Sequence, residues 1–438
     1  MKLLFIAFFC LFNGGFVNAQ KPNIIYIMTD DLGFADLSCY GRTAYQTPNI
    51  DLLAKEGIKC LNAYASAPVC TPTRTAFITG MHPAKTIVGL YEPLDWTAND
   101  SIVGLTAASP SIARNLSKAG YRTFLVGKWH LGFNPSSSPR KNGFDYFFGM
   151  NGGGVNYFTH RSPDFGADDL YENETPIQRK EYLTNLLTDK AIQIIQEKHT
   201  KPFFLSLMFN APHWPWQGPA DSVLYEGENE NKWKEIGSID NYLAMMKSLD
   251  DAIGKIMQVV KQSTNANNTI VIFTSDNGGE MYSDMGIYKG KKMGLWEGGI
   301  RVPAIVWWPG KIKPGTFSNQ VLSTVDWNAT ITKLTGAKQP NNFASDGINL
   351  MPILLNKSKE FKRTIYWRVF QRSNQKAVRS GNYKFLQDAK GEEYLFDLVK
   401  DPTESNNLKN SQNVIFKQLK TKMNDWEKTV LTPIPIQK

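Results

Sequence analysis

Apolar runs of strand length alternate with helical patterns over most of the chain. Four of these runs have the length and composition of buried strands: residues 23–29, 121–127, 202–209 and 269–275. Helical periodicity covers residues 182–198 and 241–262, and each of these segments leads into one of the later runs. The alternation predicts an α/β fold, with a large mainly parallel sheet flanked by helices on both faces.

Start and stop signals give the expected bounds of further helices. Thr47 is a candidate N-cap, Pro48 would take the first helical position, and Gly57 would end that helix. A second helix is expected to close at Gly120, directly before the strand at 121–127, and a third near residues 326–334. A further apolar run at residues 302–308 is read as a strand.

The pattern changes near residue 352. From there the apolar runs are short, alternate with polar residues and are separated by turns, as at 364–370, 376–381, 383–388 and 393–398. This pattern predicts antiparallel hairpins. We therefore expect a main domain at residues 20–351 and a small C-terminal subdomain with an antiparallel sheet at residues 352–438.

The first nineteen residues have the features of a secretion signal. Lys2 supplies the positive charge, an apolar run follows, and Val17-Asn18-Ala19 is a small-residue cleavage site. The apolar run is too short for an anchor that spans a bilayer, and no later stretch has that length. We expect residues 1–19 to be removed near Ala19 and the mature protein to be secreted or periplasmic.

Charge and cysteine content narrow the class of protein. The net charge is +9, or +8 once Lys2 is removed, which suits an anionic substrate as well as an ordinary basic surface. Long Lys/Arg blocks and RNA-binding aromatic motifs are absent from the sequence, so nucleic acid is a poor partner. The mature chain keeps three cysteines, Cys39, Cys60 and Cys70. This odd number allows one disulfide pair and one free cysteine with a separate role.

Acids, bases and amides follow the predicted strands directly. In an open parallel sheet these positions meet at the carboxyl edge, where ligands bind. Each signal alone is also typical of a solvated turn or a surface corner, but several at one edge favour a site. The residues concerned are Asp30, Asp31, Lys128, His130, His213, Asp276 and Asn277.

Two pairs of adjacent residues in this set, Asp30-Asp31 and Asp276-Asn277, offer only oxygen ligands to a metal ion. Hard cations such as Ca²⁺ or Mg²⁺ prefer that set, whereas Zn²⁺ usually recruits histidine or cysteine. The sequence therefore predicts a hard-cation site at this edge.

Cys70 lies where a helix is expected to begin, just before Pro72. A helix N-terminus offers free N–H groups and a positive dipole end, which suit an oxyanion. Arg74, one turn further on, could hold the same anion or neutralise the acids. Lys292 lies in the glycine-rich segment 290–303, which could bring a cation close to an anion.

Taken together, these motifs resemble the type I sulfatases, which have the alkaline-phosphatase-like fold. The segment "PVCTPTRTAFITG" around Cys70 matches the first signature of that family, and "GYRTFLVGKWH" at 120–130 is similar to the second. Further blocks, including "SDNGG", "WEGGIRVP" and "YLFDLVKDPTESNNL", follow in family order and extend the resemblance over nearly all of the mature chain.

The resemblance implies a sulfuric ester hydrolase whose nucleophile is formylglycine (3-oxoalanine), made from Cys70 by a formylglycine-generating or sulfatase-maturing enzyme. It implies one Ca²⁺ ion, with these ligands: Asp30, Asp31, the modified Cys70, Asp276 and Asn277.

The resemblance also assigns roles to the basic residues. Arg74 would stabilise the aldehyde hydrate, and Lys128 and Lys292 would bind the sulfate oxygens. His130 would act as the base that helps to release sulfate, and His213 as the acid for the leaving group. The assignment of Lys292 depends on its spacing to Glu297, because other lysines lie close to it.

The motifs do not define the substrate. Segments 151–174 and 214–233 would form the pocket walls or ordinary surface loops, and His160 and Arg161 in the first are candidate contacts for a sulfated sugar. A sulfated carbohydrate is the expected substrate, with algal ulvan or carrageenan and glycosaminoglycans all admissible. The alternatives are a phosphodiester or phosphonate hydrolase of the same superfamily, and a non-enzymatic glycan-binding protein in which Cys70 stays a thiol.

Overall fold

The chain is described by a computed structural model that covers residues 20–95, 102–162, 166–225, 232–233, 235–340, 343–371 and 373–434. The predicted signal peptide at 1–19 lies outside these residues. The α-helices are α1 Pro48–Glu56, α2 Cys70–Thr79, α3 Ile112–Lys118, α4 Leu183–Gln196, α5 Ile239–Gln262, α6 Glu297–Ile300, α7 Thr324–Thr335, α8 Met351–Leu354 and α9 Asn413–Glu427. Among the residues described, none of the helices is long and apolar enough to span a membrane.

The largest sheet has ten strands in the order β11-β2-β10-β9-β1-β8-β4-β5-β6-β7. Its middle strands β9, β1, β8, β4 and β5 run parallel to one another. Their bounds, and those of the flanking strands, are β1 Asn23–Thr29, β2 Ile58–Cys60, β4 Arg122–Lys128, β5 Tyr146–Met150, β6 Tyr171–Glu172, β7 Thr175–Pro176, β8 Phe203–Met208, β9 Thr269–Ser275, β10 Ala304–Trp307 and β11 Thr316–Ser318. A two-stranded sheet pairs β3 Ala63–Tyr64 with β12 Leu322–Ser323.

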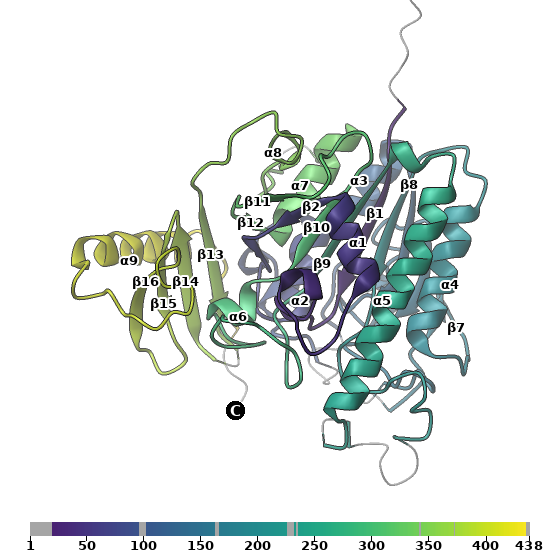
Figure 1. Ribbon diagram of the computed structural model, residues 1–438, viewed down its shortest axis with the longest axis horizontal. Helices are drawn as coiled ribbons and strands as arrows, with labels where there is room; N and C mark the ends of the chain where they lie inside the picture. The colour runs from purple at the N-terminus through teal and green to yellow at the C-terminus, as the bar shows by residue number, and fades with distance from the viewer. Residues whose placement is uncertain are drawn as a thin grey trace, which may run out of the picture.

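Helices cover both faces of the ten-stranded sheet because its central strands are apolar on both faces. In β1, Ile25 and Ile27 pack with α1, α4 and α5, whereas Ile24, Tyr26 and Met28 pack on the opposite face with α2, α3 and α7 (Figure 1). This arrangement confirms the predicted α/β class and fixes the carboxyl ends of the parallel strands at one edge.

A third sheet, with four antiparallel strands, forms the C-terminal part, as predicted. Its strands are β13 Thr364–Val369, β14 Gln375–Ser380, β15 Tyr383–Gln387 and β16 Glu393–Asp397. One face packs against the main body, where the Trp367 indole N–H donates to the carbonyl of Ala65 at 2.8 Å. The other face is covered by α9, which stands at the far end of the molecule (Figure 1).

Several elements go beyond the sequence expectation, among them the parallel strand β5, and two of them need an explanation. The run at 302–308 does form a strand, β10, but this strand pairs antiparallel with both β9 and β2. Helix α9 was not predicted at all. Its inward face buries Leu419 and Met423 and packs Ile415, Phe416 and Trp426 against the sheet, so its apolar residues recur at helical spacing and the sequence carried a signal that was missed.

Candidate active site

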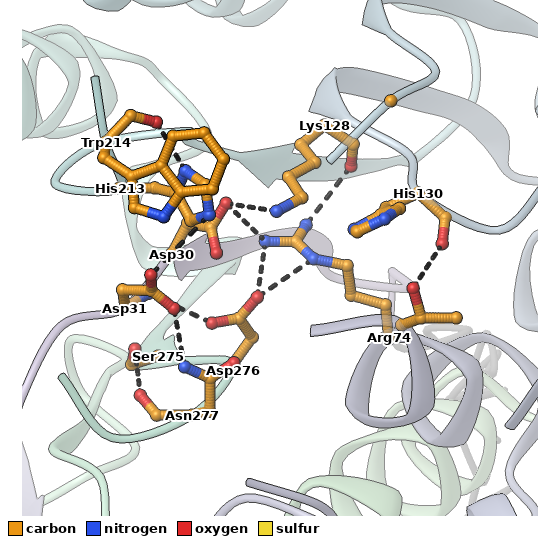
Figure 2. Close-up of polar contacts among 12 residues, drawn as sticks. Asp30, Asp31, Arg74, Lys128, His130, His213, Trp214, Ser275, Asp276 and Asn277 are labelled. Atoms are coloured by element: carbon orange, nitrogen blue, oxygen red, sulfur yellow. Dashed lines mark hydrogen bonds and ion pairs between the residues drawn. The ribbon is translucent and has the colours of Figure 1, made fainter. Parts of the chain in front are cut away.

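Side chains from five separate segments meet beyond the carboxyl ends of the parallel strands (Figure 2). Asp30 and Asp31 follow β1, His130 follows β4, His213 follows β8, and Asp276 and Asn277 follow β9; Lys128 is the last residue of β4, and Arg74 enters from α2. The predicted convergence is therefore present, because parallel strands place their carboxyl ends at the same edge.

The oxygen-rich set lies close enough to hold a metal ion. Ligand atoms of Asp30, Cys70 and Asp276 lie within 4.8 Å of one another, as do those of Asp30, Asp31 and His213. Among the described residues, Asp30 Oδ1 and Asn277 Oδ1 are buried without a hydrogen-bond partner. A cation would satisfy these oxygens, since a buried polar atom without a partner is costly, and the donor set suits Ca²⁺.

Arg74 and Lys128 balance the charge of the buried carboxylates. Arg74 donates to Asp276 Oδ2 from Nε at 3.0 Å and from Nη2 at 2.8 Å, and Lys128 Nζ lies 2.5 Å from Asp30 Oδ2. Burial raises the pKa of Asp30 well above its usual range, assisted by the charge of Asp276. For Asp276, Arg74 and Lys128 outweigh the effect of burial, so that its pKa is lowered.

Asp31 is held from two sides. Lys292 Nζ lies 2.7 Å from Asp31 Oδ2, and the Asn277 side-chain amide donates to Asp31 Oδ1 at 2.7 Å. Asp31 adopts a left-handed backbone conformation with φ 63°, which is uncommon for a residue with a side chain. Three lysines lie in this loop, Lys289, Lys291 and Lys292, and the structure brings Lys292 to the acids. The ion pair with Asp31 raises the pKa of Lys292 above its usual value, although burial acts to lower it.

Cys70 is the first residue of α2 and is only 2 % exposed. Val69 is the N-cap residue, and its side chain cannot accept a hydrogen bond. The N-cap side chain therefore leaves the first backbone N–H groups of the helix without a partner of its own. This geometry agrees with the predicted helix N-terminus at the cysteine. Cys39, Cys60 and Cys70 are all free cysteines in the structure.

The two histidines are oriented by backbone carbonyls. His130 Nε2 donates to the carbonyl of Leu94 at 2.9 Å, and His213 Nδ1 donates to the carbonyl of Trp214 at 2.6 Å. With Nδ1 as the donor, the other ring nitrogen of His213 faces Asp31 Oδ2 at 3.7 Å. A carbonyl partner fixes which nitrogen carries the proton in the neutral ring.

A cavity of about 210 Å³ opens in front of Cys70. It is lined by Val69, Cys70, Pro93, Asp95, His130, Gly153, His213, Trp214, Glu280, Lys292 and Met293. The buried acids, Arg74 and Lys128 lie behind this lining, with Lys128 only 1 % exposed. The cavity has an aromatic wall and charged groups at its base, as expected of a small polar ligand site.

His160 and Arg161 do not join this group. The His160 ring is 1 % exposed and its Nε2 donates to the carbonyl of Glu181 at 3.1 Å. Arg161 is exposed and donates from Nε to the carbonyl of Gly166 at 2.9 Å. Neither residue lines the cavity with Cys70. His160, with φ 55°, follows the turn at residues 157–159, and its ring is held by a backbone carbonyl 21 residues further along the chain.

The sequence argument missed Asp95 and Glu280, the two acids of the cavity lining. Asp95 lies in "YEPLDW" and Glu280 directly after "SDNGG". The position of Glu280, three residues after Asn277, was a usable signal, because it follows the strand-end pair in the same loop. For Asp95, no predicted strand end or motif lies nearby.

A parallel sheet that gathers acids, an amide, bases and a helix-borne cysteine at its carboxyl edge defines a hydrolase of the alkaline-phosphatase-like class. A model of the family described as Sulfatase matches residues 22–337, and one described as N-sulphoglucosamine sulphohydrolase, C-terminal, matches residues 284–429. The chain therefore belongs to the sulfatase family and is a sulfatase. The resemblance inferred from the sequence is thereby confirmed.

Curated relatives and solved structures agree with this assignment. The chain is 32 % identical to N-acetylgalactosamine-6-sulfatase of Mus musculus over 386 residues, covering 83 % of this chain and 72 % of the relative. It is 34 % identical to an arylsulfatase of Hemicentrotus pulcherrimus over 391 residues, covering 83 % and 67 %. The structure named Ps i-CgsB in complex with k-i-k-neocarrahexaose superposes with a TM-score of 0.83 at 30 % identity, covering 96 % of this chain and 95 % of that one.

Proposed function

We propose that the protein removes sulfate from a sulfated carbohydrate, with formylglycine made from Cys70 as nucleophile and one bound Ca²⁺. The observation that carries the proposal is the approach of Cys70 to the acids: its Sγ and the nearest carboxylate oxygens of Asp30 and Asp276 lie within 4.8 Å of one another. A thiol that served only packing is expected among apolar side chains, whereas Cys70 lies beside carboxylates that are paired with Arg74 and Lys128.

The proposed Ca²⁺ ligands are Asp30, Asp31, Asp276, Asn277 and the modified residue 70. The ion would supply positive charge that acidifies a bound hydroxyl at neutral pH. Formylglycine, as its hydrate, offers two oxygens on one carbon, so that sulfate can leave without hydrolysis of a stable serine-type ester.

The chain's own basic groups would do the positioning and the proton transfer. Lys292 lines the cavity, and Lys128 lies behind it at Asp30, so that both ammonium groups would bind sulfate oxygens from one side. Arg74, which already forms an ion pair with Asp276, would hold the modified side chain with its positive charge. As the imidazolium, with Nδ1–H still donated to the Trp214 carbonyl, His213 would hold a second proton on Nε2 for the leaving alcohol. His130 would accept the proton when sulfate is released.

Oxidation of Cys70 would have to precede folding. Cys70 is 2 % exposed, and Thr71, Pro72 and Thr73 are also buried in α2. A maturing enzyme therefore could not reach the segment in the folded protein. This step fits the proposed export through residues 1–19, since the chain is unfolded while it is being synthesised and exported.

A sulfated carbohydrate is supported by the similar proteins, because one relative is named N-acetylgalactosamine-6-sulfatase and one similar structure is a complex with a neocarrahexaose. Contacts of His160 and Arg161 with the sugar remain predictions, as does the division into domains at residue 351.

The test combines two measurements on protein made with and without a sulfatase-maturing enzyme. Peptide mass spectrometry should find formylglycine at position 70, and only the converted protein should release sulfate from sulfated oligosaccharides in a calcium-containing buffer. Faster hydrolysis of matched phosphate esters would favour the phosphoester reaction instead. An unconverted Cys70 with full activity would refute the proposed nucleophile.

A further inference from the structure

We infer that Glu92 is a positioning residue for His130, the proposed base, because it fixes the segment whose backbone carbonyl decides which ring nitrogen of His130 accepts a proton. The inference rests on the proposed function, since the role of His130 belongs to that function. It starts from a buried carboxylate that does not line the cavity: Glu92 is 5 % exposed, and the proposed chemistry gives it no role.

The ring of His130 is oriented by one backbone carbonyl. The backbone of His130 is held by its N–H, which donates to the carbonyl of Asn151 at 3.1 Å, and by its carbonyl, which accepts from Thr71 Oγ1 at 3.2 Å. The orientation of the ring depends on contacts of the ring itself, and its Nε2 donates to the carbonyl of Leu94 at 2.9 Å. A carbonyl only accepts, so in the neutral ring Nε2 carries the proton and Nδ1 does not.

This tautomer suits the proposed release of sulfate. His130 lines the cavity together with Cys70, and because Nε2 is engaged by Leu94, Nδ1 is the nitrogen that would take the proton. The second hydroxyl of the residue-70 hydrate would give its proton to Nδ1 and form the C=O bond, while sulfate leaves with the electron pair of the broken C–O bond. The opposite tautomer already carries a proton on Nδ1 and could not act as the base there.

Leu94 takes its own position from its neighbours. Its N–H donates to Thr71 Oγ1 at 3.1 Å, and the residue before it is Pro93, whose ring restricts the backbone. A stiff link of one residue therefore transmits the position of Glu92 to Leu94. Residues 91–95 are all described by the structure and lie in no helix or strand, so hydrogen bonds of this kind set the course of the segment.

Glu92 joins this segment to the C-terminal sheet. Its Oε2 accepts the N–H groups of Phe370 and Gln371, both at 2.8 Å, and its own N–H donates to Gln371 Oε1 at 2.9 Å. These bonds connect one residue to the turn that directly follows β13. A buried carboxylate that accepts two N–H groups is a strong anchor, because hydrogen bonds to a charged acceptor are stronger than neutral ones.

The tautomer of His130 can be measured without turnover. The chain has five histidines, and long-range proton–nitrogen NMR of isotope-labelled histidine distinguishes a protonated ring nitrogen from an unprotonated one. His130→Gln assigns the signals of His130. At about pH 8, where an ordinary histidine is neutral, we expect the Nε2–H tautomer in the unsubstituted protein and a mixture of both tautomers in Glu92→Ala.

Further variants separate positioning from a general loss of structure. Glu92→Gln can still accept both N–H groups, and burial already raises the pKa of Glu92 to about 7, so the site tolerates an uncharged side chain and the tautomer should be kept. Gln371→Ala removes only the acceptor of the Glu92 N–H. It should shift the tautomers in the same direction as Glu92→Ala, and it serves if Glu92→Ala does not fold.

Glu427→Ala is the matched control for Glu92→Ala. It makes the same chemical change on a carboxylate of the C-terminal subdomain, where Glu427 pairs with Lys376 at 2.8 Å. It should change neither the tautomer of His130 nor the kinetics.

In the converted protein, Glu92→Ala should slow one step only. With para-nitrophenyl sulfate as the probe, kcat should fall by roughly tenfold or more, because a misdirected base loses part of the about 10²–10⁴-fold that general base catalysis supplies. Sulfate release would then limit turnover, so KM should fall by the same factor and kcat/KM should stay unchanged. Sulfated residue 70 should accumulate, with a first-turnover burst of para-nitrophenol.

An unchanged single tautomer in Glu92→Ala and Gln371→Ala, or a fall in kcat/KM of Glu92→Ala without a burst, would overturn the inference. A converted, unsubstituted protein that releases no sulfate would instead refute the proposed function. The tautomer measurement would then decide on its own whether Glu92 positions His130.

Discussion

Cys70 combines two properties that rarely occur together in one cysteine. It is almost fully buried, which is typical of an inert packing thiol, yet it stands at a helix start beside buried acids. Burial of this kind protects a reactive group from solvent without removing it from a ligand that enters the cavity. The position of the residue, not its exposure, identifies it as the candidate nucleophile.

Replacing Cys70 by alanine should abolish turnover while the fold is kept. Because the reacting group itself is lost, kcat should fall by on the order of 10⁴-fold or more, measured as sulfate release by protein purified away from other sulfatases. The thermal midpoint should change little, since one small side chain is removed at a cavity wall. Activity retained by this variant would contradict the proposed role.

The Asp276→Asn substitution should lower both metal content and stability. Asp276 receives two hydrogen bonds from Arg74, and neither group is more than 1 % exposed. Removal of one partner from a buried ion pair costs about 3–5 kcal/mol. Calcium content by elemental analysis and denaturant unfolding would measure the two effects, with Asp251→Asn as an exposed control. A variant with full calcium content would exclude Asp276 as a ligand.

At this scale the sequence predicts the groups proposed for the chemistry and misses two acids of the cavity lining. Asp30, Lys128 and Asp276 were predictable because each stands at the end of an apolar run that predicts a parallel strand, and the carboxyl ends of such strands meet at one edge. Asp95 looks like any loop acid, and it reaches the cavity only because Leu94 is fixed by Thr71 and His130. Contacts between segments so far apart in the chain leave no local pattern.

The elements follow the sequence where local signals are strong. Helix α1 begins at Pro48 and ends at Glu56, just before Gly57, and β1, β4, β8 and β9 occupy the predicted runs. The direction of β10 was not predictable, because the hydrophobic pattern of a buried strand is the same in both directions. Its antiparallel course follows from the way the segment after β9 returns along the sheet.

Helix α9 stabilises the C-terminal sheet through a small contact, so a single large-to-small change should be informative. Met423 is fully buried against Val378, Phe385 and Leu395, and Met423→Ala should cost about 2–5 kcal/mol. Val414→Ala on the same helix is the matched control, because Val414 is 70 % exposed. Denaturant unfolding followed by far-UV circular dichroism would compare the two. Equal effects would mean that α9 does not stabilise the sheet through this face.

The C-terminal sheet also reaches the cavity of the main body. The β13–β14 turn contacts the segment before Asp95, because the N–H of Phe370 donates to Glu92. The Gln375 side chain binds the segment after Lys292. It accepts from the N–H of Leu295 at 3.0 Å and donates to the carbonyl of Met293 at 3.0 Å. Two loops of the lining are thus fixed by a sheet that lies further along the chain, 278 residues from Glu92 in one contact and 80 residues from Leu295 in the other. The molecule needs both sheets to define one pocket.

A buried charge cluster joins the same two parts. Lys384 on β15 lies 2.9 Å from Glu297 Oε1 and 2.8 Å from Glu404 Oε1, and none of the three is more than 1 % exposed. Although burial acts to raise it, Lys384, Arg301 and Arg379 lower the pKa of Glu297 to about 2. Glu404 is then the second carboxylate on an already paired lysine, and burial raises its pKa to about 7.

The protonation of Glu404 couples the stability of the whole molecule to pH. Its pKa rises from 4.5 to about 7 on folding, so the folded state binds more protons than the unfolded state between these values. Its contribution to stability is therefore present below about pH 4.5 and is lost as the pH rises towards 7. Glu404→Gln removes this titration, keeps an acceptor for the N–H of Glu297, and should flatten the decline of the thermal midpoint from pH 5 to pH 7.

The size of the effect is on the order of 1–3 kcal/mol, from the shift of one carboxyl pKa. Thermal midpoints at half-unit pH steps would measure it, with Glu392→Gln as a control because Glu392 is an exposed acid of the same subdomain. Parallel pH profiles for the unsubstituted protein and Glu404→Gln would show that Glu404 is ionised throughout the range. In that case Lys384 would carry two carboxylates at neutral pH, and the contact between the two sheets would not respond to protons.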